Sequence, residues 1–293
     1  MPRKLPPEGY LTSTQAAQIL GCSVGMVYNY ERAGQLHKRI PSGRKQGFFV
    51  LNEVQALAEG LSSFFESSIE ENRAEKDHLV FSQATPDDME GVYKVAASLF
   101  GDTTSAEARK PLVAQCPEGN YVVKNNGKIV AYIHIQPLKH DRLMAFMRGE
   151  IRGKQITAQD LDGFTPGESV ECLIKSVGAA KNIGNTEENC RHNQIRYIFK
   201  LLRGTAFEMA RLGEKGVNIT TIYATSETVT GIAMAFSAKM EQFGKPLGVG
   251  RFRFVLDVEK SDLPLLHPYK QAFAKWRKEH ENANFNAISK IHN

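Results

Sequence analysis

Apolar positions near the N-terminus recur at helical spacing within short stretches that breakers separate. Thr12 and Gln15 form a capping box, in which a hydroxyl and an amide satisfy the first free N–H groups of a helix. An apolar stripe follows as far as Leu20, and a break at residues 21–23 precedes a second helical stretch at residues 24–32. The pattern therefore predicts two short helices in close succession.

A hairpin and a third helix are predicted next. The segments 36–40 and 48–50 flank residues 41–47, a basic tip bounded by glycine, and two strands around such a tip form a hairpin. Asn52 and Gln55 then begin a third helical stretch. These elements make up one small module.

Beyond residue 79, strand-like and helix-like stretches follow in the order β-α-α-β-β-β-α-β-α-β. The strands are predicted at residues 79–81, 121–123, 128–138, 169–177, 219–223 and 251–258, and the helices at 86–100, 105–115, 195–212 and 228–241. The turn Asn125-Asn126-Gly127 is a strong hairpin signal. Residues 139–168 are predicted to be irregular. The fold class is therefore α+β or α/β, a mixed β-sheet flanked by helices behind a small N-terminal module.

Composition narrows the class of protein. Apolar residues make up 42% and charged residues 24% of the 293 positions, which are ordinary globular values. No apolar stretch is long enough for a membrane span, and the N-terminus lacks a secretory signal. The four cysteines lack metal-ligand spacing, so we expect no metal, reduced thiols and a cytoplasmic location.

Charge is distributed unevenly along the chain. Residues 1–50 hold seven Lys/Arg against two Glu, a net charge of +5, while residues 51–79 hold seven acidic residues against two basic ones, a net charge of −5. A nucleic-acid-binding head on an acidic connector has this distribution. An unevenly charged solvated surface has it too.

One resemblance covers the run LTSTQAAQILGCSVGMVYNYERAGQLHKRIPSGRKQGFFVLNEVQALA. It resembles the MerR/excisionase class of winged helix-turn-helix domains, which implies a module at residues 1–66 that binds double-stranded DNA and regulates transcription. The second helix would enter the major groove and the wing would contact phosphates. The residues implied to contact DNA are Gly25, Met26, Tyr28, Asn29, Arg32, Lys38, Arg39, Arg44 and Lys45. A protein-interaction module with a basic surface is the alternative.

A short apolar stripe follows the wing and leads into a polar linker, residues 67–78. Leu57, Leu61, Phe64 and Phe65 keep helical spacing, and in the resembled class such a helix often carries dimer contacts. We therefore expect a homodimer, although these side chains could equally complete the core of their own module.

The second part of the chain, residues 79–260, resembles the GNAT-type N-acetyltransferases. The matching runs are LVFSQATPDDMEGVYKVAASLFGD, NYVVKNNGKIVAYIHI, ESVECLIKSVGAA and NITTIYATSETVTGIAMAFSAKMEQFGKP. The resemblance implies that acetyl-CoA or another acyl-CoA is the cofactor. Residues 261–293 form a C-terminal helical extension and tail.

The turn that holds the coenzyme A pyrophosphate in this family has the pattern [RQ]-x-x-G-x-[GA]. The stretch Arg191–Arg196 lacks its glycines, and Gly184 lies earlier. Without glycine the backbone approaches a phosphate less closely, so we expect weak or absent binding. Five residues are the candidates for cofactor contact: Val177, Arg191, Asn193, Gln194 and Arg196.

Catalysis in this family needs a carboxylate base and often a tyrosine acid. Glu171 lies on the fourth strand, where the base commonly lies, although a surface carboxylate is the simpler interpretation. Phe236 and Ser237 stand nearest the place of the tyrosine, with Tyr223 and Tyr197 as possible substitutes that are better explained as core residues. The histidines His134 and His192 have no visible partner and are interpreted as structural.

These departures from the family pattern decide the order of the hypotheses. The first is a DNA-binding transcriptional regulator whose GNAT-like domain senses a small ligand or mediates assembly. The second is an acyl-CoA-dependent N-acetyltransferase that carries a DNA-binding head, and the third is a purely structural dimerisation domain.

Overall fold

The computed structural model describes residues 6–20, 24–32, 36–42, 47–57, 79–180, 187–248 and 250–291. Within these ranges, side chains are described except those of Met26, Asn29, Val229 and residues 187–192 and 281–291. The chain divides into two compact units. The first comprises Met1–Ala74 with Thr228–Met240, and the second comprises Glu75–Glu227 with Glu241–Asn293.

The N-terminal unit contains short helices and a small antiparallel sheet. Helix α1 (Ser13–Ile19) is followed by α2 (Val24–Arg32), and residues 51–57 are helical. The strands β1 (Tyr10–Leu11), β2 (Lys38–Arg39) and β3 (Phe48–Val50) pair in the order β1-β3-β2. The capping box at Thr12 and Gln15 is confirmed, since the Gln15 N–H donates to the Thr12 hydroxyl at 3.2 Å.

The core of this unit is built from small and aromatic side chains. Ala16 and Ala17 of α1 are buried together with Val27 of α2 and Phe49 of β3. Alanines at this contact allow two helices to approach closely. Three residues of α8 (Val229–Ser237) also pack on the cluster: Ile232, Ala233 and Phe236. A helix far along the chain therefore completes the core of the N-terminal unit.

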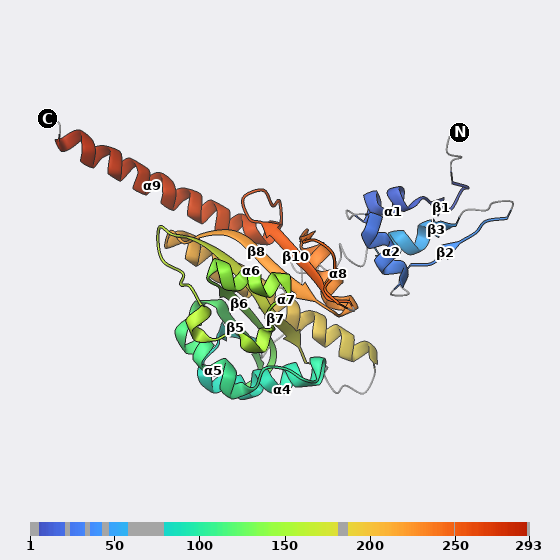
Figure 1. Cartoon of the computed structure of the whole chain (residues 1–293), viewed down its shortest axis with the longest axis horizontal. Helices are drawn as coiled ribbons and strands as arrows, with labels where there is room; N and C mark the ends of the chain where they lie inside the picture. The colour runs from blue at the N-terminus through green and yellow to red at the C-terminus, as the bar shows by residue number, and fades with distance from the viewer. Residues whose placement is uncertain are drawn as a thin grey trace. The chain divides into compact units, whose positions relative to one another are not determined.

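The second unit is built on a seven-stranded mixed sheet in the order β4-β5-β6-β7-β8-β10-β9 (Figure 1). The strands are β4 (Leu79–Gln83), β5 (Asn120–Asn125), β6 (Lys128–Pro137), β7 (Ser169–Ala179), β8 (Asn218–Ser226), β9 (Glu241–Gln242) and β10 (Phe252–Asp257). Neighbouring strands are antiparallel except β7 and β8, which are parallel. The strands and helices predicted for residues 79–258 occur in the predicted order, but the structure adds α6 (His140–Arg148) and β9, and α8 belongs to the N-terminal unit. The prediction of a mixed sheet flanked by helices is confirmed.

Helices cover both faces of this sheet. They are α4 (Met89–Phe100), α5 (Ala106–Gln115), α6 (His140–Arg148), α7 (Glu187–Glu214) and α9 (His267–Ile291). Neighbouring residues of a strand point to opposite faces. Val122 of β5 lies in the core beneath α4, whereas Tyr121 stacks on Phe81, which lies against Gly204 of α7. Helices α4 and α7 therefore lie on opposite faces.

Short 3-10 turns connect several of these elements. They are η1 (Pro86–Asp88), η2 (Pro117–Gly119), η3 (Gly153–Gln155), η4 (Ala158–Asp160) and η5 (Pro264–Leu266). The turn between β5 and β6 has Asn126 at φ 48° and Gly127 at φ 77°. Two consecutive positive φ angles are those of a type I′ hairpin turn, which confirms the Asn-Gly prediction.

Two predicted elements differ from the structure. Residues 139–168 are not wholly irregular, because they contain α6, η3 and η4. Helix α7 begins at Glu187, eight residues before the predicted start at Ile195. The first residues of α7 are polar, so periodicity does not reveal its start. In α6, by contrast, Leu143, Phe146 and Met147 are buried at helical spacing, a signal that the prediction did not use.

Candidate functional site

The parallel strands β7 and β8 separate partway along their length. Their pairing ends at Ile174 and Ala224, although β7 continues to Ala179 and β8 to Ser226. Among the described residues, the backbone of residues 175–179 has no strand partner on the β8 side. An extended ligand could pair with backbone groups on this side, although the Ala179 carbonyl already accepts from the side-chain amide of Gln194.

Glu171 lies on the paired part of β7 and is hydrogen-bonded by two other side chains. Nδ1 of His140 lies 2.5 Å from one carboxylate oxygen, and the Tyr223 hydroxyl donates to the other at 3.1 Å. His140 begins α6, whereas Tyr223 belongs to β8, two residues beyond the position paired with Glu171. Residues far apart in the sequence thus meet at one carboxylate, which is the predicted candidate base.

The neighbouring carboxylate makes the His140 imidazole more basic than an ordinary histidine. The hydrogen bond to Glu171 and its negative charge raise the pKa of the His140 imidazole above its usual range. Burial and the nearby Glu171 raise the pKa of Tyr223 to about 12, so its hydroxyl stays protonated. With Nδ1–H donated to the carboxylate, Nε2 of His140 carries the lone pair, and this side chain is 66% exposed. The arrangement is that of a histidine base oriented by a carboxylate.

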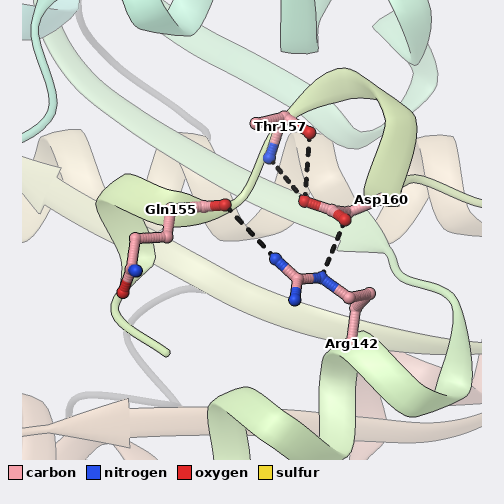
Figure 2. Close-up of polar contacts among 4 residues, drawn as sticks. All are labelled: Arg142, Gln155, Thr157 and Asp160. Atoms are coloured by element: carbon pink, nitrogen blue, oxygen red, sulfur yellow. Dashed lines mark hydrogen bonds and ion pairs between the residues drawn. The ribbon is translucent and has the colours of Figure 1, made fainter. Parts of the chain in front are cut away.

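A polar latch holds α6 beside the following loop (Figure 2). Nε of Arg142 donates to Asp160 at 2.8 Å, and the other Asp160 oxygen accepts from the backbone N–H and the hydroxyl of Thr157 at 2.8 and 3.1 Å. The guanidinium also reaches the carbonyl of Gln155 at 3.5 Å. Because the backbone N–H of Lys139 donates to the Asp160 carbonyl at 3.0 Å, the latch fixes the start of α6 and with it His140.

The predicted cofactor residues do not form a turn in this structure. Asn193, Gln194 and Arg196 lie within α7, whose start at Glu187 makes residues 181–186 the connection from β7. Gln194 donates from its side-chain amide to the carbonyl of Ala179 at 3.2 Å, closing the end of β7. Backbone N–H groups inside a helix are engaged, so only side chains of these residues could reach a cofactor.

Two other predicted cofactor residues have different positions. Val177 lies on the part of β7 that has no partner in β8. Arg191 is in α7, and its side chain lies outside the described residues, as does that of His192. Residues 181–186, including Gly184, also lie outside them. The assignment of these residues to a cofactor site stays a prediction.

The residues predicted to contact DNA are only partly described. Gly25, Arg32, Lys38 and Arg39 are exposed. Tyr28 differs from the prediction of an exposed face, because its ring packs edge-on against Phe49 at 6.0 Å and beneath the Lys38 ammonium at 4.7 Å. An aromatic ring gains by covering apolar surface, and this explains the difference. The side chains of Met26 and Asn29, and the wing residues Arg44 and Lys45, lie outside the described residues.

The sequence analysis did not identify His140 as a site residue, and it interpreted Tyr223 as a core residue. His140 lies 31 residues from Glu171 in the chain, so no local spacing links the two. Tyr197, the other substitute considered for the acid, is 3% exposed, and its hydroxyl oxygen accepts from Asn125 at 3.4 Å. His134 is buried, and it does have a partner, Asn120.

Structural comparison finds folds similar to the second unit. The GphF GNAT-like decarboxylase in complex with isobutyryl-CoA is 14% identical at a TM-score of 0.43, over 61% of this chain and 98% of that chain. YncA from Salmonella typhimurium, solved with its cofactor acetyl-CoA, is 15% identical at a TM-score of 0.38, over 64% of this chain and 98% of that chain. At these identities the likeness concerns the fold alone.

A third structure matches over a smaller share of its length. The loading GNATL domain of CurA from Lyngbya majuscula is 13% identical at a TM-score of 0.35, and the match covers 50% of this chain and 64% of that domain. No protein family matches the chain. No curated protein matches it either.

Within the described part of the chain, we looked for a membrane-spanning helix, a metal site and a reactive thiol at Cys116, and found none of them. None of the described helices has the length and apolarity to cross a bilayer. The described His, Cys, Asp and Glu side chains do not gather in groups of three or more that could hold a metal ion. Burial raises the pKa of the Cys116 thiol to about 12, which leaves it unreactive near neutral pH.

Proposed function

We propose that the second unit is an acyl-CoA-dependent N-acyltransferase in which Glu171 and His140 accept the proton of the attacking amine. The observation that carries the proposal is the pairing of Glu171 with His140 and Tyr223, close to the point where β7 and β8 separate. A base oriented by a carboxylate is suited to deprotonating an ammonium group before it attacks an acyl carbon. The sequence resemblance to GNAT-type enzymes supports the same activity.

The residues present fit one part of an acyl-CoA. Residues 175–179 of β7 have no partner in β8, and the amide-bearing arm of coenzyme A could bind their backbone groups in the way that an added strand would. The pyrophosphate is less well matched, because α7 begins with two acidic residues in the sequence, and negative charge disfavours an anion there. We therefore keep the expectation of weak coenzyme binding.

An acyl-CoA bound along β7 would supply the activated acyl group. Nε2 of His140 would take the proton of the amine, while Glu171 holds Nδ1–H and stabilises the imidazolium that forms. Tyr223 would fix the second carboxylate oxygen and keep Glu171 pointed toward His140. Since His140 must be neutral to accept a proton, the rate should rise with pH through its elevated pKa.

The test is acyl transfer from acetyl-CoA to a panel of primary amines, followed by release of the free thiol. We expect measurable turnover, and we expect His140→Gln and Glu171→Gln each to lower kcat by roughly a hundredfold or more. Glu90→Gln, which removes an exposed carboxylate of α4, is the matched control. Turnover at background level, with no binding heat in calorimetry, would refute the activity.

A second candidate function, DNA binding by the N-terminal unit, is supported by a separate observation. Two helices in succession precede a basic hairpin, and Arg32, Lys38 and Arg39 are exposed. We propose that this unit is a winged helix-turn-helix in which α2 contacts bases and the hairpin contacts phosphates of double-stranded DNA. Together with the first proposal, this describes an acyltransferase that carries a DNA-binding head.

The DNA proposal is best tested with the full chain, because α8 completes the core of this unit. Arg44→Ala with Lys45→Ala should weaken binding to all duplexes and flatten its salt dependence by about one to two units of slope. Asn29→Ala should instead change the sequence preference. Lys94→Ala with Lys110→Ala is the control, since both lysines lie on helices of the sheet unit. Absence of duplex binding at low salt would end this proposal.

Homodimerisation is proposed on the sequence pattern. Leu57 packs on the core of the N-terminal unit, while Leu61, Phe64 and Phe65 lie outside the described residues. Sedimentation of the full chain, free and on DNA, is the test, and a monomer in both states would contradict it.

The domain limits at residues 66, 78 and 260 remain predictions that took no account of α8.

A further inference from the structure

A buried arginine side chain lies on the face of the sheet that α4 and α5 cover. Arg109 of α5 is only 4% exposed, and it donates to the Thr104 carbonyl at 2.9 Å and to the Thr103 hydroxyl at 3.0 Å. The guanidinium carbon also lies 5.6 Å from the centre of the Tyr132 ring. No carboxylate of the described residues forms an ion pair with it. A buried charge without a partner is costly, because arginine does not lose its proton.

Two other basic side chains near Arg109 have buried nitrogen atoms without a hydrogen-bond partner. Nζ of Lys175 is buried without a hydrogen-bond partner, and so is Nε2 of His134, a residue only 3% exposed. Nδ1 of His134 is used, because it donates to the side-chain oxygen of Asn120. Lys175 is the bulged residue of β7, since β6 pairs His134 with Ser176 and the next residue with Ile174.

Tyr132 connects the three basic residues. Its ring lies beneath the Arg109 guanidinium and 5.2 Å from the ring of His134, measured between centroids. Its hydroxyl lies 2.6 Å from that of Ser176, the neighbour of Lys175 in β7. Arg109 and His134 thus contact the Tyr132 ring, and Lys175 is the chain neighbour of the serine bonded to the Tyr132 hydroxyl. We call Arg109, His134 and Lys175 the basic cluster.

Electrostatics shows that the cluster lacks a compensating charge. Burial and then the charge of Arg109 lower the pKa of Lys175 to about 7 and lower that of His134. Asp160 is the carboxylate that acts in the opposite direction on Lys175, and it is already bonded to Arg142 and Thr157. An anion next to these groups would restore their protonation and satisfy the unpartnered nitrogens.

We propose that the basic cluster binds one small anion, either an inorganic ion or a small carboxylate, inside the protein beneath α5. The anion accepts from Nζ of Lys175 and from Nε2 of a protonated His134, beside the charge of Arg109. Binding takes up protons, because both donors need one that burial would otherwise remove. The site does not depend on the acyltransferase proposal.

The test is thermal unfolding of the full chain in increasing sodium chloride or sodium formate, with ionic strength held constant by a bulky anion such as gluconate. We expect a saturable rise in Tm that is larger at pH 6 than at pH 8. Chloride acting alone indicates an inorganic ion, and a stronger effect of formate indicates a carboxylate. No saturable rise with either anion overturns the proposal.

Lys175→Met removes the amine and keeps the apolar length of the side chain. It should weaken anion binding about tenfold to a hundredfold, the effect of losing one charge-assisted hydrogen bond. Lys128→Met, at an exposed lysine on the neighbouring strand, is the matched control and should leave the anion effect unchanged. Equal anion dependence in Lys175→Met and the unaltered protein overturns the proposal. A crystal soaked in bromide supplies an independent readout, since an anomalous peak should appear within the cluster and its absence counts against the site.

Discussion

At the scale of single residues, the basicity of His140 comes from a neighbour and not from burial. The imidazole is two-thirds exposed, yet its Nδ1 is 2.5 Å from the Glu171 carboxylate, which favours the protonated ring. The raised pKa favours the imidazole as a proton acceptor. In the proposed reaction, Glu171 therefore acts by orienting His140.

The first prediction is that Glu171→Gln lowers the pKa of His140 toward 6.5, the ordinary value for histidine. An amide accepts a hydrogen bond but carries no charge, so the protonated ring loses most of its stabilisation. NMR titration of the His140 ring protons measures the pKa directly. Glu90→Gln should leave it unchanged, and an unaltered value in Glu171→Gln would mean that the pair does not form in solution.

Because the folded pKa of His140 is raised, the pair stabilises the protein below pH 6.5 and loses this contribution as pH rises through the folded value. The second prediction is therefore that the stability difference between the unaltered protein and His140→Gln is larger at pH 5.5 than at pH 8. Urea unfolding at the two values measures it. A difference that grows with pH would contradict the pairing.

At the scale of elements, α6 is held in place by polar contacts at its start. Asp160 is the centre of the latch, since its side chain is 13% exposed and accepts from both Thr157 and Arg142. Burial acts to raise the Asp160 pKa, but hydrogen bonds from the Thr157 backbone, Arg142 and the Thr157 hydroxyl, with the charge of Arg142, lower it overall. The contribution is present near neutral pH and is lost as pH falls through the folded pKa.

The third prediction is that Asp160→Asn lowers the free energy of unfolding by about 1 kcal/mol at pH 7, the usual net contribution of a hydrogen bond, because the contacts of this carboxylate are only partly buried. The difference should shrink as pH falls toward 3, because the unaltered carboxylate is then protonated. Urea unfolding is the measurement, and Asp162→Asn at an exposed position is the control. An equal loss of stability in the control would show that the latch makes no specific contribution.

The β5–β6 turn allows a test of backbone conformation by itself. A Cβ at Gly127 would meet no atom within 4 Å, so the positive φ of 77° is the only obstacle to a side chain. The fourth prediction is that Gly127→Ala lowers stability by about 1 kcal/mol. Gly163→Ala, at a glycine without a positive φ and with ordinary space around it, should cost less when both are compared by thermal unfolding.

At the scale of the whole molecule, helix α8 belongs to a different unit from the chain segments that precede and follow it. Residues 228–240 belong to the N-terminal unit, whereas the segments before and after them belong to the sheet unit. Phe236, which stands nearest the place of the tyrosine expected from the family, packs instead on the core of the N-terminal unit. Its apolar character is explained by that contact.

The fifth prediction is that Phe236→Ala destabilises the N-terminal unit by about 2 kcal/mol, less than the cost at a fully buried phenylalanine. Hydrogen exchange should become faster in α1 and α2 and stay unchanged in β5 and β6. Phe207→Ala, at a phenylalanine that is 62% exposed, is the control. Unchanged exchange in α1 and α2 would show that α8 contributes nothing to this core.

The sequence by itself determined the features that local chemistry controls. The capping box at Thr12 and Gln15 and the turn at Asn126 and Gly127 each depend on a few consecutive residues, and both formed as expected. The order of strands and helices in the sheet unit also followed from periodicity, because buried strands and long amphipathic helices have strong patterns. Glu171 was found through its place in that order.

Only the tertiary structure decided which residues surround Glu171 and which core α8 completes. His140 and Tyr223 reach the carboxylate from positions 31 and 52 residues away in the chain, and no sequence period records such a distance. The start of α7 depended on contacts with neighbouring segments, since its first residues are polar and a polar helical turn is not stable by itself. The helix α6, by contrast, has buried residues at helical spacing that the prediction did not use. The basic cluster arose in the same way, because the chain brings Arg109, His134 and Lys175 together only when β6 pairs with β7 beneath α5.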